Sequence, residues 1–221
     1  MEKQLWTAVD QYTTDLLIPP DPVLDAALAD SNAGGLPTIN VSPAQGKLLM
    51  LLAKVAGASQ ILEIGTLGGY STIWLARALP ADGRLITLEY SPKHAEVARG
   101  NIERAGFGAV VEIRVGDARM SVEELAAEGG PAFDFIFIDA DKRSIPHYFE
   151  WSLKMSHSGT VIIVDNVVRD GALVDAKSED PNVHGVRKLH EMLAGEPRVS
   201  ATTIQTVGSK GYDGFTLAVV G

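Results

Sequence analysis

The sequence predicts an α/β protein whose doubly wound sheet has seven strands. Short apolar segments alternate with segments of helical periodicity between residues 60 and 194. This alternation is typical of parallel strands with helices on both faces of the sheet. The last two apolar segments are separated only by "GSKGYD", and so short a connection permits an antiparallel hairpin but no crossover. We therefore expect five parallel strands followed by an antiparallel pair.

Residues 1–40 are predicted to form an N-terminal helical extension. Apolar residues recur there at helical spacing, at Leu5, Val9, Tyr12 and Leu16. The segment "IPPDP" ends this helix because proline cannot continue the helical turn, and a short helix is expected in "VLDAALAD". Ser42 precedes Pro43 as an N-cap precedes a first-turn proline, which predicts the next helix over 43–56.

The rest of the chain alternates regularly. Strands are expected at 60–65, 84–90, 110–115, 133–139 and 160–166, and helices at 70–79, 92–105, 121–127, 144–155 and 183–194. The terminal hairpin is expected at 198–207 and 214–220. Because no repeat or long linker interrupts this order, we expect residues 1–221 to form a single domain.

Composition and charge narrow the class of protein. With 46% hydrophobic and 21% charged residues, the chain is expected to fold around a sizeable core. A net charge of −9 argues against nucleic acid or an anionic membrane as the main partner. The chain has no cysteine, which excludes thiolate metal sites. No secretory signal is visible in "MEKQLWTAVD", and "LLMLLAKVAGA" is too short for a membrane span, so we expect a cytoplasmic protein.

A glycine-rich turn follows the first strand in "LEIGTLGGYS". Gly65 permits close approach of a ligand, but Leu67 and Tyr70 occupy the second and third glycine positions of G-x-G-x-x-G, so a dinucleotide fits poorly. Glu89 ends the second strand, close to the offset at which an acid meets ribose hydroxyls. Asp117 in "VGDA" ends the third strand, where it either accepts from an adenine amino group or forms a turn. The turn together with Glu89 indicates a nucleoside-containing cofactor.

Oxygen-bearing side chains also end the fourth and fifth strands. Asp139 ends the fourth strand, and Asp165 with Asn166 ends the fifth. One βαβ step brings these ends together, and two carboxylates with an amide oxygen suit Mg²⁺ or another oxygen-preferring dication such as Mn²⁺ or Ca²⁺. Such residues also cap turns at strand ends, and we assign that role to Asp141.

These segments, taken in order, carry a resemblance. The sequences "ILEIGTLGGYSTIWLA", "GRLITLEY", "VGDA", "FDFIFIDADK" and "GTVIIVDNVV" resemble the class I S-adenosylmethionine-dependent O-methyltransferases of the metal-dependent catechol and caffeoyl-coenzyme A type. The similarity runs from "INVSPAQG" to the C-terminal strand. It implies a Rossmann-like fold and metal-dependent methyl transfer from S-adenosylmethionine to a vicinal diol, giving S-adenosylhomocysteine. It also implies a homodimer, with the N-terminal residues covering the acceptor site.

The resemblance assigns roles to individual residues. Lys142 matches the catalytic lysine, which takes the proton of a metal-bound hydroxyl. The metal ligands are expected to be Asp139, Asp165 and Asn166. Val41, through its backbone, and Ser71 match positions that hold the methionine carboxylate of the cofactor, and Glu63 a position near its amino group. The complete set expected around the cofactor is Val41, Glu63, Gly65, Tyr70, Ser71, Glu89, Asp117 and Asp139. Tyr70 is expected beside the sulfonium, although a core aromatic would fit the same pattern.

Two long segments set the expected acceptor pocket apart from the family pattern. They are "VVRDGALVDAKSEDPNVHG" and "VGSKGYDGFTL", and from them we expect Arg169, Tyr212 and Asp213 to select the acceptor. A catechol, a caffeoyl thioester, a flavonoid and a specialised metabolite all remain open. Two other functions are weighed against methyl transfer: a nicotinamide oxidoreductase, weakened by the missing glycine motif, and a cofactor-binding protein without catalysis, which turnover would exclude.

Overall fold

The computed structural model describes residues 2–221; Met1, the first residue of the predicted extension and domain, lies outside the described residues. A seven-stranded sheet runs in the order β3-β2-β1-β4-β5-β7-β6. Its strands are β1 (Gln60–Ile64), β2 (Arg84–Glu89), β3 (Val111–Val115), β4 (Phe133–Ile138), β5 (Ser156–Asp165), β6 (Val199–Gly208) and β7 (Gly211–Val220). The strands β1 to β5 pair in parallel, and β7 pairs antiparallel with both β5 and β6. The predicted α/β architecture is confirmed.

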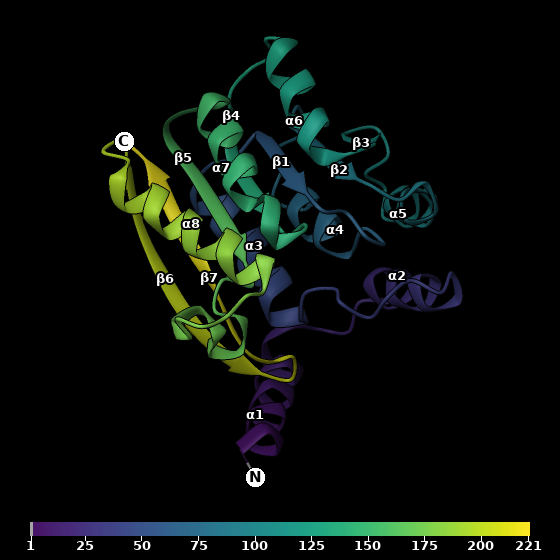
Figure 1. Ribbon diagram of the computed structural model, residues 1–221. Coiled ribbons are helices and arrows are strands. Elements are labelled where there is room, and N and C mark those ends of the chain that lie inside the picture. Colours follow the sequence, from purple (N-terminus) through teal and green to yellow (C-terminus); the bar gives the residue numbers. More distant parts are fainter. Residues whose placement is uncertain (1) are drawn as a thin grey trace.

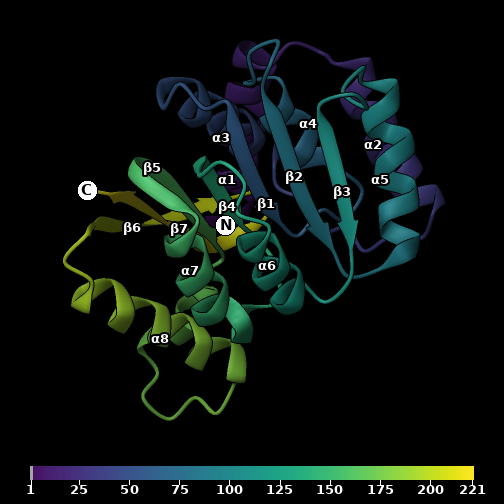
Figure 2. The ribbon, with the colours of Figure 1, turned by 90° about the horizontal axis from the view of Figure 1, so that it is seen from above.

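Helices cover both faces of this sheet (Figures 1 and 2). The α-helices are α1 (Glu2–Leu17), α2 (Pro22–Ala33), α3 (Pro43–Val55), α4 (Tyr70–Ala76), α5 (Pro92–Arg104), α6 (Ala118–Ala127), α7 (Ile145–Lys154) and α8 (Pro181–Gly195). Two 3₁₀ segments, η1 (Lys142–Ser144) and η2 (Arg169–Val174), follow β4 and β5. Figure 2 shows α6, α7 and α8 on one face, and α3, α4 and α5 on the other.

The central strands β1, β4 and β5 are largely apolar on both faces because each face is covered. Ile64, Ile138 and Val164 point into a core shared with α6, α7 and α8. Phe135 and Phe137 alternate with them and point into a second core, shared with α2 to α5. Strand side chains alternate between faces, so a continuous apolar run fills both cores and leaves the polar residues to the strand ends.

Local signals set several helix starts. Ser42 accepts a hydrogen bond from the amide of Gln45 at 3.2 Å, which confirms the predicted N-cap of α3. The side chain of Asp117 accepts from the amide of Arg119 at 3.0 Å, and α6 therefore begins at Ala118, three residues before the predicted start.

The terminal hairpin differs from the prediction. The expected six-residue connection is a two-residue turn, Ser209 and Lys210, because β6 extends to Gly208 and β7 begins at Gly211. Gly211 has a φ of +107°, a backbone conformation that favours glycine. The amide of Ser209 donates to the carboxylate of Asp10 in α1 at 2.7 Å. The long C-terminal segment is therefore mostly strand, with a short turn at its tip.

Helix α1 projects from the rest of the protein (Figure 1) and none of its described residues is buried. Within residues 2–221, no helix has the length and apolar content needed to cross a bilayer.

Candidate active site

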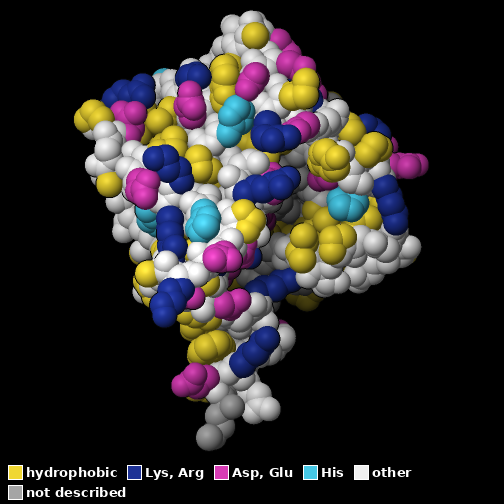
Figure 3. Space-filling view, in the orientation of Figure 1, with side chains coloured by type: hydrophobic (Ala, Val, Ile, Leu, Met, Phe, Trp, Pro, Cys, Tyr) yellow, Lys and Arg dark blue, Asp and Glu magenta, His cyan; other side chains and the backbone are white. Residues whose placement is uncertain are grey.

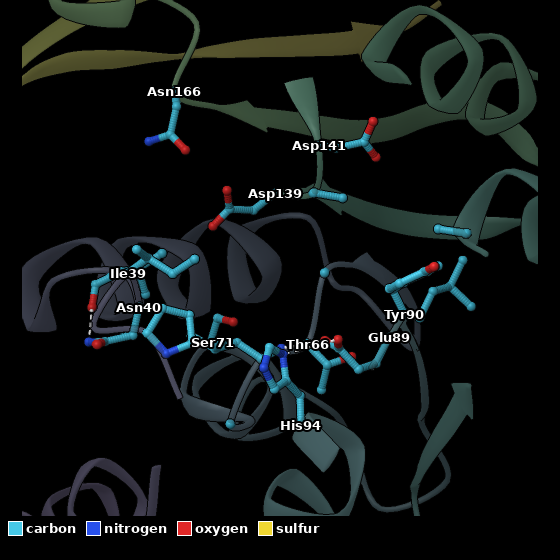
Figure 4. Close-up of a pocket in the computed structure, with 18 of the residues that line it drawn as sticks. Ile39, Asn40, Thr66, Ser71, Glu89, Tyr90, His94, Asp139, Asp141 and Asn166 are labelled. Carbon is cyan, nitrogen blue, oxygen red and sulfur yellow. Dashed lines mark hydrogen bonds and ion pairs between the residues drawn. The ribbon is translucent and has the colours of Figure 1, made fainter. Parts of the chain in front are cut away.

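A cavity of about 920 Å³ opens at the carboxyl ends of β1, β2 and β4. The strand order reverses direction between β1 and β4, and ligands of open α/β sheets bind at such a switch point. Residues of α2 and of the segment 37–41 close one side of the cavity, whereas no residue of α1 lines it. Figure 4 shows side chains that are far apart in the sequence, from Ile39 to Asn166, gathered around this cavity.

The glycine turn brings the ends of β1 and β4 into contact. Gly65 has a φ of +109°, and a β-carbon there would lie 2.3 Å from the carbonyl oxygen of Asp139. The amide of Gly65 donates to the carbonyl of Leu88 at 3.0 Å, and the amide of Asp139 donates to Ile64 at 2.8 Å. Only glycine fits this position, and the backbone there borders the cavity as expected.

Glu89 lies at the end of β2 and lines the cavity while only 7% exposed. One carboxylate oxygen accepts from the amide of Leu67 in the glycine turn at 2.8 Å. The other accepts from the amide of Ser91 at 2.9 Å and lies 3.3 Å from the ring of His94. Each oxygen keeps a lone pair for a further donor, so the predicted role of binding ribose hydroxyls fits these contacts.

Glu63 lies beneath the cavity rather than in its wall. It is fully buried, and its carboxylate accepts hydrogen bonds from Ser71 at 2.6 Å, from Thr87 at 2.7 Å and from Thr72. Burial raises the pKa of Glu63 to about 7, against the lowering effect of the hydroxyl groups. Glu63 therefore connects to the cavity through Ser71, which does line it.

The methionine end of the predicted cofactor site is formed by Val41, Tyr70 and Ser71, all of which line the cavity. The carbonyl of Val41 accepts from the side-chain amide of Asn40 at 3.0 Å, drawn as a dashed line in Figure 4. Among residues 2–221, the amide of Val41 donates to no group, which leaves it for a ligand carboxylate. Tyr70 is 5% exposed and belongs to the core as well as to the cavity wall, so both of its expected roles fit.

Asp117 lines the cavity at the end of β3 but is already engaged as the N-cap of α6. Its carboxylate pairs with the guanidinium of Arg119 at 2.6 Å, and this contact lowers the pKa of Asp117 to about 2. An ionised carboxylate at this point accepts hydrogen bonds only. The turn role considered from the sequence is observed, and a contact with adenine stays a prediction.

The residues predicted to bind metal gather between β4 and β5. Figure 4 shows the side chains of Asp139 and Asn166 pointing toward one another. The amine of Lys142 lies 2.6 Å from Asp139, and Lys142 is only 8% exposed. Asp165 is 5% exposed, and burial together with the charge of Asp139 raises its pKa to about 7. Asp141 points away and accepts from the hydroxyl of Tyr148 at 2.6 Å, in keeping with its structural assignment.

This donor set fits a divalent cation. Within the described residues no three His, Cys, Asp or Glu side chains converge on one point, and the set is two carboxylates with an amide oxygen. Among residues 2–221, Lys142 is the cation beside these two adjacent carboxylates, and the amide of Asn166 also donates to Asp165 at 2.8 Å. A hard dication relieves their repulsion, and a three-ligand site leaves positions for water or substrate oxygens.

The three residues expected to select the acceptor are placed differently. Arg169 lines the cavity, whereas Tyr212 and Asp213 are absent from its lining. Asp213 accepts from the amides of Val168 and Arg169, at 3.0 Å each, and the hydroxyl of Tyr212 donates to the side chain of Gln205. Asp213 thus supports the loop after β5, Tyr212 bonds across the β6–β7 hairpin, and a role of either residue in selecting the acceptor stays a prediction.

Sequence reasoning missed several residues of the site. Thr87 bonds Glu63 because β1 and β2 pair in a register that places the two residues side by side, which the sequence does not reveal. His94 lines the cavity five positions after Glu89, a spacing that a search of the following helix would have found. Lys210 also lines the cavity, whereas the sequence had indicated its neighbours Tyr212 and Asp213 as the residues that select the acceptor.

The chain matches the family model described as O-methyltransferase over residues 23–219. It belongs to the O-methyltransferase family. A relative named catechol O-methyltransferase, from Niastella koreensis, is 52% identical over 220 residues, which is 100% of both chains. An O-methyltransferase structure from Bacillus cereus in complex with SAH is 59% identical, with a TM-score of 0.97 over 99% of both chains.

A further O-methyltransferase structure, TomG from Streptomyces achromogenes in complex with SAM, is 51% identical, with a TM-score of 0.96 over 100% of this chain and 99% of that one. The family and these neighbours show that this O-methyltransferase is an S-adenosylmethionine-dependent transferase, as the sequence resemblance implied. They decide against the nicotinamide oxidoreductase and the non-catalytic binding protein.

Proposed function

We propose that this O-methyltransferase moves the methyl group of S-adenosylmethionine to a hydroxyl of a vicinal aromatic diol, and that the reaction requires a divalent metal. The observation that carries the proposal is the group of Asp139, Asp165 and Asn166, with the amine of Lys142 2.6 Å from Asp139. The relative from Niastella koreensis is named a catechol O-methyltransferase, and catechol has the two adjacent hydroxyls that such a group would orient.

Asp139, Asp165 and Asn166 would hold Mg²⁺ or a similar oxygen-preferring dication. When bound, such an ion acts as a Lewis acid that lowers the pKa of the acceptor hydroxyls and orients them. The chemistry of this set supports the assignment, because two neighbouring carboxylates share the single positive charge of Lys142 among the described residues.

Lys142 is the proposed general base. Its burial keeps bulk water from its amine, and the hydrogen bond to Asp139 holds that amine at the end of β4. In its neutral form the amine accepts the hydroxyl proton of the acceptor. The acceptor oxygen then forms a bond to the methyl carbon as the bond from that carbon to sulfur breaks, which gives the methyl ether and S-adenosylhomocysteine.

The remaining residues position the cofactor for this displacement. Val41 and Ser71 are proposed to hold its methionine carboxylate, Glu89 its ribose, Asp117 its adenine and Tyr70 the region of its sulfonium. Gly65 lets the backbone approach closely, and Glu63 orients Ser71 from below. Alignment of the methyl group with the acceptor oxygen is expected to supply much of the acceleration.

Methyl transfer to catechol, measured with Mg²⁺ and with EDTA, tests the proposal. EDTA and Asp165→Ala are each expected to lower turnover about 100-fold or more, because the acceptor then loses its electrostatic activation. Asp82→Ala, which changes an exposed acid in a distant turn, serves as the control and is expected to leave turnover unchanged. Turnover that persists in EDTA while Asp165→Ala stays fully active would contradict metal dependence.

A further inference from the structure

Five basic side chains line the active-site cavity: Arg119, Lys142, Arg143, Arg169 and Lys210. Three of them have acidic partners, namely Asp117 for Arg119, Asp139 for Lys142 and Asp141 for Arg143, at 2.6, 2.6 and 3.5 Å. Within residues 2–221, neither Arg169 nor Lys210 forms an ion pair. The surface view shows Lys and Arg side chains bordering the hollow on this face of the protein (Figure 3). The cavity therefore has two positive charges without an internal counter-charge.

Arg169 is held in place by a strained and well-supported loop. Its φ is +57°, followed by +53° at Asp170 and +84° at Gly171, and the left-handed conformation is unfavourable for residues other than glycine. Asp213 fixes the start of this loop by accepting from the amides of Val168 and Arg169. Such strain persists only where neighbouring contacts impose it, so the loop presents Arg169 to the cavity in one defined way.

The side chain of Arg169 lacks a partner that its chemistry requires. Its Nε is buried and has no hydrogen-bond acceptor among the described residues. A buried guanidinium N–H without an acceptor is unfavourable, and carboxylates are the groups that best match the planar guanidinium. At the tip of the β6–β7 hairpin, partial burial lowers the pKa of Lys210, which is the effect of desolvation without a compensating acid. Both residues are therefore suited to an anionic ligand group.

We propose that the methyl acceptor carries a carboxylate on its aromatic ring, which Arg169 binds with support from Lys210. This inference rests on the proposed function, because the hydroxyls of the same acceptor are assigned to the metal site. Arg169 follows Asn166 by only three residues. The carboxylate and the diol of the acceptor would therefore both be bound by residues that follow β5. Arg169 lines the same cavity as Asn166, and this placement favours a carboxylate inside the cavity over the phosphates of a large thioester carrier, which would stay at the cavity mouth.

Two acceptors that differ in the charge of one group and by one methyl group test the inference: 3,4-dihydroxybenzoate and its methyl ester. Their kcat/KM values would be measured with S-adenosylmethionine and Mg²⁺. The wild type is expected to prefer the acid by roughly 10- to 100-fold, the usual effect of a charge-assisted hydrogen bond. Arg169→Gln is expected to remove most of this preference by lowering kcat/KM far more for the acid than for the ester. Arg169→Lys is expected to keep part of it, and Lys210→Gln to reduce it several-fold.

Lys188→Gln is the matched control for Lys210→Gln. Lys188 lies on α8, is exposed and pairs with Glu191 at 3.2 Å outside the cavity, so the same change of charge is expected to leave the acid-to-ester ratio as it was. Urea unfolding and S-adenosylmethionine affinity would show that each variant is folded. Equal losses on acid and ester in Arg169→Gln would overturn the inference, because Arg169 would then only shape the cavity.

Two further experiments distinguish the ring carboxylate from the carrier phosphates as the ligand, and binding from catalysis. If caffeoyl-coenzyme A loses its advantage in Arg169→Gln while the free acid does not, the carrier phosphates are the ligand and the inference is wrong. Calorimetric binding of the acid and the ester to the SAH complex keeps the test independent of catalysis. Absence of turnover on every acceptor would count against the proposed function alone, while tighter binding of the acid that is lost in Arg169→Gln would still support the inference.

Discussion

At the scale of single residues, Glu63 makes the stability of the folded protein depend on pH. Its carboxyl is fully buried under Ser71, and burial raises its pKa from 4.5 to about 7. Between these two values the folded protein binds more protons than the unfolded chain. The contribution of Glu63 to the free energy of unfolding therefore falls as the pH rises from about 4.5 to about 7, and it is largest below the unfolded pKa.

Glu63→Gln is expected to remove this share of the pH dependence, because the amide stays neutral. When the pH is raised from 5 to 8, the wild type should lose on the order of 2 to 3 kcal/mol more free energy of unfolding than the variant does. Urea unfolding of the cofactor-free protein at both pH values measures the difference. Glu124→Gln, at an exposed position on α6, is the control and should follow the wild type. Identical pH dependence in wild type and Glu63→Gln would show that Glu63 is not the titrating group.

At the scale of secondary-structure elements, α8 supports the segment that carries the proposed general base. Gly185 lies in the middle of α8, and a β-carbon there would lie 2.2 Å from the carbonyl oxygen of Lys142 and 2.8 Å from the α-carbon of Arg143. The helix backbone thus packs directly on η1. A methyl group at this point must push the two elements apart.

Gly185→Ala is therefore expected to lower the free energy of unfolding by about 1 to 3 kcal/mol and to reduce kcat by displacing Lys142. Affinity for S-adenosylmethionine should change little, because Gly65, Ser71 and Glu89 lie on other elements. The control is Gly100→Ala in α5, where a β-carbon meets nothing within 4 Å and helix propensity alone should stabilise the protein. Unfolding, kcat and cofactor affinity of both variants are the measurements. An unchanged kcat in Gly185→Ala would refute the positioning role.

Prediction from the sequence succeeded at this scale where local chemistry decides the outcome. Short apolar segments and helical periodicity located the strands and α-helices described within residues 2–221, and Ser42 marked the start of α3. Contacts between segments far apart in the chain could not be predicted from the sequence. The burial of Glu63 beneath Ser71 depends on the register of β1 and β2, and the two-residue hairpin turn depends on pairing that extends both strands. The same pairing left Tyr212 outside the cavity and placed Lys210 in its wall.

At the scale of the whole molecule, α1 differs from the other helices because its apolar side chains are exposed. It carries an apolar stripe whose members are all exposed, at 64%, 53%, 69% and 66% for Leu5, Val9, Tyr12 and Leu16. These side chains follow the helical period and so lie on one face. Exposed apolar surface of this continuity is typical of protein–protein contacts. We propose that a second copy of the chain covers it, as expected from the sequence resemblance.

The protein is therefore expected to sediment at about twice the 23.5 kDa mass of the chain. Replacing Leu5 and Leu16 by Asp should yield a species of half that mass, because burying two carboxylates in an apolar contact is unfavourable. Replacing Thr7 and Gln11 by Asp adds the same charge on another face of α1 and should leave the dimer intact. Since no residue of α1 lines the cavity, the monomeric variant should keep its affinity for S-adenosylmethionine. A wild type that sediments only at 23.5 kDa would rule out the second copy, and loss of cofactor binding upon dissociation would show that the partner subunit completes the site.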